Sequence, residues 1–370
     1  MRIVVTGGNG FIGKNLRLRL SEEGQTNVVS LTRTSTQAEW EAALSGADIV
    51  FHLAGVNRPQ DPVDFMCGNF ELTARICTLL EAAGNHTTLV LSSSTQAMVD
   101  NPYGRSKVAA ERAVIDYAER TGARTVVMRL PNVFGKWARP DYNSVVATFC
   151  YNLLHDLPIT IHDEDAPLRL VYIDDVVDTM LTLLSSRAVS RWLDVMPVYD
   201  TTVGEMAAIL RAIAANRKTL TVPRVGVGLS RALHATFLSY VEPESFSYRI
   251  AQHVDARGSF SEFLRTVDSG QISIFTAHPG VTRGEHYHHT KTEKFLVVHG
   301  KARFAFRHVI TGEIRSIEVS ADSLEVVETV PGWAHSVTNI SADEMIVLLW
   351  ASEIFDSARP DTIPSKVQGT

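Results

Sequence analysis

The chain has 370 residues, of which 45% are hydrophobic and 21% charged, and its formal net charge is −6. This length exceeds one typical domain, so two domains are expected. The negative charge gives no general attraction to nucleic acid or to an anionic membrane surface, and no apolar run approaches the roughly 20 residues that span a bilayer.

The first residues after Met1 are already strand-like, which leaves no room for a signal peptide. The three cysteines, Cys67, Cys77 and Cys150, form no CxxC pair and are odd in number, which fits a reducing compartment best. We therefore expect a cytoplasmic protein.

Apolar, strand-like segments alternate with helical patterns over the first two thirds of the chain. The segments are RIVVTG, NVVSLTR, ADIVFHLAG, TTLVLSSS and ARTVVMRLP. Fully apolar strands separated by amphipathic helices are typical of a parallel sheet covered on both faces. Residues 1–243 are thus predicted to form a doubly wound α/β domain of Rossmann type, with its ligand site at the carboxyl ends of the strands.

A glycine-rich turn follows the first strand at Thr6, with glycines at positions 7, 10 and 13. Such glycines permit a tight turn and the close approach of a pyrophosphate, and the helix that begins there offers free N–H groups to phosphate. We predict a dinucleotide site, the alternative being a purely structural turn. The predicted contacts are Thr6, Gly7, Gly10, Phe11, Ile12 and Gly13.

The second strand ends in SLTRTS, which lacks the acidic residue that would hold the ribose hydroxyls of NAD. Arg33 stands there instead and could pair with a 2′-phosphate, although an exposed arginine is often merely solvated. NADPH is therefore the expected cofactor.

Tyr103 and Lys107 lie four residues apart in a predicted helix that runs to about Gly122, so their side chains share a face. A neighbouring ammonium is expected to lower the pKa of the phenol, which can then donate its proton to a carbonyl oxygen as hydride arrives at the carbon. Ser94, or its neighbour Ser93, could hydrogen-bond the same oxygen.

Together these motifs resemble the extended short-chain dehydrogenase/reductase family over about residues 1–240. The motifs are TGxxGxxG, HLAG, the serine, Tyr103-xxx-Lys107 and RLPNVFG. The resemblance implies action on a nucleotide-linked sugar, a homodimer, and further cofactor contacts at Leu53, Ala54 and Gly55. It also implies that the region after the fifth strand binds the diphosphate of the substrate, for which the candidates are Asn132, Lys136, Arg139 and Arg169.

The pattern changes after about Val241, where a linker-like VEPESFSYR precedes short strand-like runs. The runs are ISIFTAH, KFLVVHG, ARFAFRHVI, IRSIEVS, LEVVETV and MIVLLW. Residues 244–370 are thus predicted to form an all-β domain, either a sandwich or a barrel.

Histidines cluster in this second domain. His286 and His288 alternate along a predicted strand and so face the same way, Glu293 follows five residues later, and His335 lies in PGWAHSVTN. Three imidazoles and a carboxylate converging in a barrel predict a divalent metal site, whereas the alternative is a set of hydrogen-bonded core histidines. His289 and His299 fall off the pattern and are predicted to lie outside the ligand set.

The spacing G-x5-H-x-H-x4-E-x6-G, together with GWAHSVTN, resembles the two motifs of the cupin β-barrel family. Pro331 directly precedes Gly332, where that family usually leaves one residue between. DARGSFSEF, residues 255–263, is similar to a segment of cupin epimerases of deoxysugar nucleotides. Zinc is the expected metal, although the ligands would also accept manganese, iron or nickel. Lys291 and Lys294 are candidate bases.

The fusion of these two domains resembles the bifunctional enzymes of bacterial capsule and O-antigen synthesis. The resemblance implies a UDP-linked 4-keto-6-deoxy-N-acetylhexosamine as substrate, epimerised at C3 by the cupin and then reduced at C4. Two alternatives remain: an NAD-dependent epimerase or dehydratase that recycles its hydride, and a cupin that serves only assembly.

Overall fold

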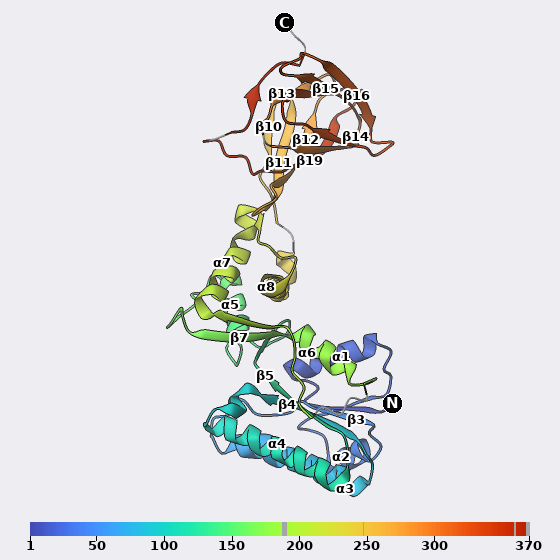
Figure 1. Ribbon diagram of the computed structural model, residues 1–370, viewed down its shortest axis with the longest axis vertical. Helices are drawn as coiled ribbons and strands as arrows, with labels where there is room; N and C mark the ends of the chain where they lie inside the picture. Colours follow the sequence, from blue (N-terminus) through green and yellow to red (C-terminus); the bar gives the residue numbers. More distant parts are fainter. Residues whose placement is uncertain (187–190, 247, 290, 359, 368–370) are drawn as a thin grey trace. The chain divides into compact units, whose positions relative to one another are not determined.

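The computed structural model describes residues 1–186, 191–246, 248–289, 291–358 and 360–367 (Figure 1). Contacts divide the chain into two units, one of residues 1–211 with 227–241 and one of residues 212–226 with 242–370. The sequence predicts one boundary, after residue 243. In the structure, residues 212–226 also group with the second unit, so the division between the units is not a single point in the chain. Among the described residues, no helix is both long enough and apolar enough to cross a membrane.

The first unit is built on a five-stranded parallel sheet of order β2-β1-β3-β4-β5. These strands are the five apolar segments of the sequence, and they are almost wholly buried except for β2, because helices cover both faces. The Rossmann-like α/β prediction is confirmed. The strands are β1 (Ile3–Thr6), β2 (Val28–Leu31), β3 (Ile49–His52), β4 (Thr88–Ser94) and β5 (Thr125–Leu130).

Helices lie on both faces of this sheet (Figure 1). On one face, side chains such as Ile76, Leu80 and Tyr117 form a core with Val4 and Val50 of the strands. The other face carries the packed pair α1 and α6. The helices are α1 (Phe11–Glu22), α2 (Gln37–Leu44), α3 (Leu72–Ala83), α4 (Pro102–Thr121) and α6 (Ile173–Thr182), with the short turns η1 (Met66–Glu71) and η2 (Thr95–Met98).

The chain changes direction across the sheet at β1, which lies between β2 and β3. The connection that leaves β1 and the connection that leaves β3 run to opposite sides of the sheet. Between them a crevice opens at the carboxyl ends of β1 and β3, and doubly wound proteins bind their ligands in such a crevice. Gly7 and Leu53 begin the loops at this crevice. The glycine-rich turn therefore lies at the position where proteins of this fold bind their ligands.

A small sheet, β6-β7-β8, follows the main one. Helices α5 and α8 pack together. These elements are β6 (Asn132–Phe134), α5 (Val145–Leu154), β7 (Pro167–Tyr172), β8 (Val198–Thr202), α7 (Val203–Thr219) and α8 (Gly228–Leu238), with η3 (Pro243–Ser245) after them.

The second unit contains two antiparallel sheets, of order β10-β11-β12-β19-β14-β17 and β16-β15-β18-β13-β20, and β9 pairs with β11. The strand-like runs of the sequence are β12, β14, β15, β16, β17 and β19, so the all-β prediction is confirmed. The strands are β9 (Thr221–Val222), β10 (His253–Asp255), β11 (Gly258–Thr266), β12 (Gln271–Ala277), β13 (Thr282–Tyr287), β14 (Glu293–His299), β15 (Lys301–His308), β16 (Ile314–Ser320), β17 (Val326–Thr329), β18 (Trp333–Asn339), β19 (Met345–Ala351) and β20 (Ile363–Pro364).

The core of this unit lies between the sheets. Phe275 and Phe295 of one sheet and Phe304 and Val337 of the other belong to one buried cluster. Alternate residues along β12 and β15 are buried, as the strand period of two requires. This packing fixes β13 and β18, from which His286 and His335 project. His288 was expected on the same strand as His286, but β13 ends at Tyr287, one residue before it.

Candidate active sites

The glycine-rich turn has the close packing expected of a phosphate-binding loop. Gly7 has φ of +68°, and a Cβ there would lie 2.7 Å from the backbone nitrogen of Ala54. A Cβ at Gly13 would lie 2.3 Å from the Gly7 carbonyl oxygen, so a side chain at either position is excluded. Gly10 caps α1 without a side-chain hydrogen bond, so the first N–H groups of the helix remain available to an anion.

The loop is tied to its neighbours by a buried polar chain. The Thr6 hydroxyl bonds His52 Nδ1 at 2.7 Å and accepts from the Ala54 N–H at 3.2 Å. His52 Nε2 lies 2.9 Å from the Thr73 hydroxyl. Burial first, and then the charge of Lys107, lower the pKa of His52 to about 3, so its imidazole is neutral. Thr6 is thus a structural part of the turn.

Arg33 lies exposed two residues after β2, whose last residue, Leu31, accepts a hydrogen bond from the Gly7 N–H. The predicted 2′-phosphate contact is therefore placed beside the glycine-rich turn, at the edge where the cofactor ribose would be held.

Lys107 is 7% exposed, and its Nζ donates to the Ser92 carbonyl at 3.0 Å. A Cβ on Gly55 would lie 3.6 Å from this Nζ, which places the Leu53–Gly55 segment against the lysine. Burial lowers the pKa of Lys107 to about 8, with Glu111 opposing the shift. The predicted cofactor contacts Leu53, Ala54 and Gly55 thus lie beside Lys107, one of the predicted catalytic residues.

Tyr103 and Lys107 share a face of α4, with the ammonium 5.8 Å from the phenol ring centre. The Ser94 side chain lies near Tyr103 and favours its phenolate form. Burial outweighs this effect and raises the pKa of Tyr103. The expected lowering is therefore wrong for this structure, because the lysine is directed at the Ser92 carbonyl and desolvation of the phenolate dominates.

The two candidate serines have different partners. The Ser93 hydroxyl donates to Glu111 Oε1 at 2.5 Å, and Arg129 completes the group with a 2.6 Å ion pair to Glu111. Ser94 is the serine that contacts Tyr103, since neighbouring residues of β4 face opposite ways. The geometry thus separates two candidates that the sequence left equivalent.

The predicted substrate-binding residues lie after β5 and on β7, and two of them are already paired. Lys136 Nζ lies 2.5 Å from Asp174 Oδ1, and Arg169 Nε lies 2.8 Å from Asp200 Oδ1 in an exposed pair. The Arg139 guanidinium stacks over the Tyr142 ring, and Asn132 is exposed on β6. The sequence did not single out Arg58, which donates to the Tyr142 carbonyl.

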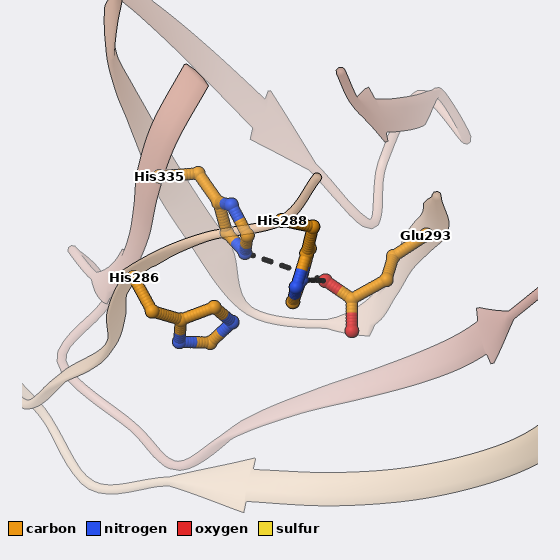
Figure 2. A group of neighbouring side chains, drawn as sticks. All are labelled: His286, His288, Glu293 and His335. Carbon is orange, nitrogen blue, oxygen red and sulfur yellow. Dashed lines mark hydrogen bonds and ion pairs between the residues drawn. The ribbon is translucent and has the colours of Figure 1, made fainter. Parts of the chain in front are cut away.

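The second candidate site brings together the four predicted metal ligands, as Figure 2 shows. One donor atom from each of His286, His288, Glu293 and His335 lies within 4.8 Å of all the others. Glu293 Oε2 lies 3.1 Å from His288 Nε2 and 3.3 Å from His335 Nε2. Two donors bound to one tetrahedral ion at about 2.0–2.1 Å would lie about 3.4 Å apart, so this spacing fits a divalent metal.

The hydrogen bonds of this cluster and the pKa values of His286 and Glu293 also fit a metal. A carbonyl oxygen can only accept, so His288 Nδ1–H donates to the Asp361 carbonyl. His288 Nε2 then faces Glu293 Oε2 at 3.1 Å, where a metal ion would take the place of a shared proton. Burial, followed by the charges of His335 and His288, lowers the pKa of His286 to about 4. Burial alone would raise the pKa of Glu293, but hydrogen bonds from His288 and His335 hold it well below its usual range. An unprotonated His286 and an ionised Glu293 are the forms that bind metal.

Other candidates in this region divide clearly by exposure. His289 and His299 are exposed, which agrees with their exclusion from the ligand set. Lys294 is exposed and paired with Glu328, whereas Lys291 is 8% exposed. Lys291 and Asp361 line a hollow of about 400 Å³. No motif in the sequence points to Asp361, which lies 68 residues beyond Glu293.

Comparisons with known proteins agree with this geometry. Residues 3–191 match the NAD dependent epimerase/dehydratase family, and residues 253–363 match the polysaccharide biosynthesis C-terminal domain. The chain belongs to the NAD-dependent epimerase/dehydratase family. Membership implies a bound nicotinamide nucleotide, to which the glycine-rich turn is suited.

Relatives of this family member extend over its full length. A UDP-2-acetamido-2,6-beta-L-arabino-hexul-4-ose reductase of Pseudomonas aeruginosa is 50% identical over 370 residues, which is 99% of each chain. The crystal structure of the capsular polysaccharide assembling protein CapF from Staphylococcus aureus matches with TM-score 0.91 and 39% identity, over 99% of this chain and 100% of that one.

The first unit alone matches more distant structures. UDP-glucose 4-epimerase of Thermus thermophilus, in complex with NAD, aligns with TM-score 0.54 and 20% identity, over 65% of this chain and 99% of that one. At this identity the match supports the fold alone. The C-terminal domain therefore distinguishes this chain from that shorter epimerase.

Proposed function

We propose that this protein is a bifunctional nucleotide-sugar enzyme. Its C-terminal domain inverts C3 of a UDP-4-keto-6-deoxy-N-acetylhexosamine, and its N-terminal domain then reduces the C4 ketone with NADPH. The product would be UDP-2-acetamido-2,6-dideoxy-L-talose, a precursor of UDP-N-acetyl-L-fucosamine for capsule or O-antigen. The observation that carries the proposal is the four-residue metal cluster in a chain that also holds a Tyr103–Lys107–Ser94 group.

The proposed reduction at C4 depends on residues at the carboxyl ends of the strands of the parallel sheet. NADPH, when bound, supplies hydride to C4. Tyr103 then donates its phenolic proton to the C4 oxygen, and Ser94, which already contacts Tyr103, orients that oxygen. The raised pKa of Tyr103 keeps the proton on the phenol until the oxygen gains charge. The full-length Pseudomonas aeruginosa relative carries the name of a hexul-4-ose reductase, which supports this half.

The epimerising half requires the C4 ketone, because the ketone makes the C3 proton acidic. A divalent metal held by His286, His288, Glu293 and His335, with zinc expected, would polarise that ketone as a Lewis acid. Lys291, buried beside the cluster, is our candidate for moving the C3 proton. Reduction removes the ketone and fixes the configuration, so epimerisation comes first.

Product analysis with and without Tyr103 tests the reducing half. We expect the wild-type enzyme to consume one NADPH for each sugar converted, whereas an enzyme that recycles its hydride would consume none. Tyr103→Phe should lower kcat for NADPH oxidation by about 10²–10⁴-fold, because the proton donor is lost.

Tyr151→Phe is the matched control, since that phenol stacks on His155 in α5 and lies outside the proposed site. Its NADPH oxidation should equal that of the wild type. Sugar conversion without net NADPH consumption would reject the proposed reduction.

A further inference from the structure

The last described residues of the chain lie against the metal cluster. We call residues 361–367 the C-terminal strap. Its strand β20 pairs with β13, with Pro364 opposite His286 and Ile363 opposite Tyr287. At its far end, Val367 is 1% exposed. The strap is thus an integral part of the sheet that carries His286.

The strap also holds the backbone just before His286. Glu285 has φ of +63°, a conformation that costs free energy for any residue except glycine, and a bulge interrupts the strand pairing there. The Glu285 carbonyl accepts from the Ser365 N–H at 2.8 Å, and its carboxylate accepts from the Val367 N–H at 2.9 Å. Two strap contacts therefore stabilise the unusual conformation that directs His286 into the cluster.

Asp361 makes the most direct contacts. Its Oδ1 accepts from the His289 N–H and its Oδ2 from the Lys291 N–H, each at 2.8 Å. Its backbone carbonyl accepts from His288 Nδ1–H. One residue thus fixes the tautomer of His288 and anchors the backbone on its carboxyl side.

The same strap contacts the proposed proton carrier, because Lys291 Nζ donates to the Thr362 hydroxyl at 3.2 Å. His286, His288 and Lys291 are therefore all fixed by a segment far from them in sequence. The hydrogen bonds of a metal ligand's second nitrogen orient the ring and tune its affinity, and losing them commonly costs 10–100-fold in metal binding.

We propose that the C-terminal strap is a positioning element of the metal centre, with Asp361 as its main positioning residue. Asp361 engages Nδ1 of His288, so that Nε2 is the nitrogen directed at the site shared with Glu293. This inference rests on the metal site of the proposed function but does not depend on which sugar is turned over.

Titration of the full-length, metal-free protein with Co²⁺ tests this inference. Asp361→Ala keeps the carbonyl that bonds His288 but removes the carboxylate that holds the His289 and Lys291 N–H groups, so the segment that carries His288 loses its anchor. We expect Co²⁺ binding to weaken about 10-fold and the intensity of the visible Co²⁺ bands, which report ligand geometry, to change. Asp361→Asn keeps the shape but loses one acceptor, so about a 5-fold loss is expected. The conservative variant keeps the test available should Asp361→Ala fail to fold.

Asp322→Ala is the matched control, because Asp322 also stabilises a turn by accepting a 2.9 Å hydrogen bond from the Ser320 hydroxyl. Its hydrogen bonds within the described residues are with Ser320 and not with a metal ligand. It should bind Co²⁺ as the wild type does. Wild-type affinity and spectrum in both Asp361 variants would overturn the role of the strap. If the wild-type protein bound Co²⁺ normally but did not turn over the sugar, the proposed function would be rejected instead.

Discussion

Two lysines near the metal cluster differ in environment, and this difference predicts their roles. Lys291 is buried and bonded to Thr362, whereas Lys294 follows Glu293 on β14 and is exposed. Lys291→Met should slow hydrogen exchange at C3 of the sugar at least about 100-fold, because the proton carrier is lost. Lys294→Met, measured by the same NMR assay, should match the wild type. Equal exchange in both variants would exclude Lys291.

His52 is predicted to make the first unit sensitive to acid. Its pKa is lowered from 6.5 to about 3 in the folded protein, so below pH 6.5 the unfolded chain binds a proton that the folded chain does not. Stability is therefore lost as the pH falls from 6.5, by about 2 kcal/mol at pH 5. The measurement is the free energy of unfolding by urea at pH 7 and pH 5.

His52→Gln keeps a side chain that can hydrogen-bond Thr6 and Thr73 but does not titrate. Its loss of stability between the two pH values should be smaller than that of the wild type by the same amount. If wild type and variant lose stability equally, the buried neutral imidazole is not the cause.

At the residue level, motif spacing carries much of the information about which side chains lie together. The structure brings His286, His288, Glu293 and His335 together, as their spacing predicts, and their role as metal ligands stays a prediction. Ser93 and Ser94 were not separable, since the choice depends on Glu111, a partner brought in by α4. The raised pKa of Tyr103 was missed because spacing reports a neighbouring lysine but not the burial of the phenol.

At the level of elements, the glycine-rich turn between β1 and α1 makes the cofactor prediction testable. A methyl group at Gly13 would lie 2.3 Å from the Gly7 carbonyl oxygen and 2.7 Å from the Gly8 Cα. Gly13→Ala should therefore deform the turn and weaken NADPH binding at least about 10-fold, with Co²⁺ binding unchanged, as titration calorimetry would show.

Gly226→Ala serves as its control, because a Cβ at Gly226 meets nothing within 4 Å. That variant should bind NADPH as the wild type does. Unchanged NADPH affinity in Gly13→Ala would place the cofactor elsewhere.

The elements themselves were largely predictable. The strands β1 to β5 are short apolar runs between helical patterns, and α4 ends at Gly122 with φ of +68°, as a glycine C-cap predicts. The strap was not predictable, because β20 has two residues and is defined by its pairing with β13. The same holds for residues 212–226, whose grouping depends on contacts with the second unit.

For the whole molecule, the proposed pair of reactions would explain why one chain carries both domains. On that proposal the epimerised ketone exists only between the two reactions, and fusion would supply it directly to its reductase. The homodimer expected from the family resemblance stays a prediction. The order of reactions is the central claim, since reduction before epimerisation would leave C3 without an acidic proton.

One measurement tests that claim most directly. The purified protein is incubated with the UDP-4-keto-6-deoxy-N-acetylhexosamine in D2O without NADPH, and C3 is followed by NMR. We predict that deuterium enters at C3 with the wild-type protein and not with His286→Ala. Absence of exchange in the wild type, with reduction still proceeding once NADPH is added, would contradict the account and leave a reductase with a structural second domain.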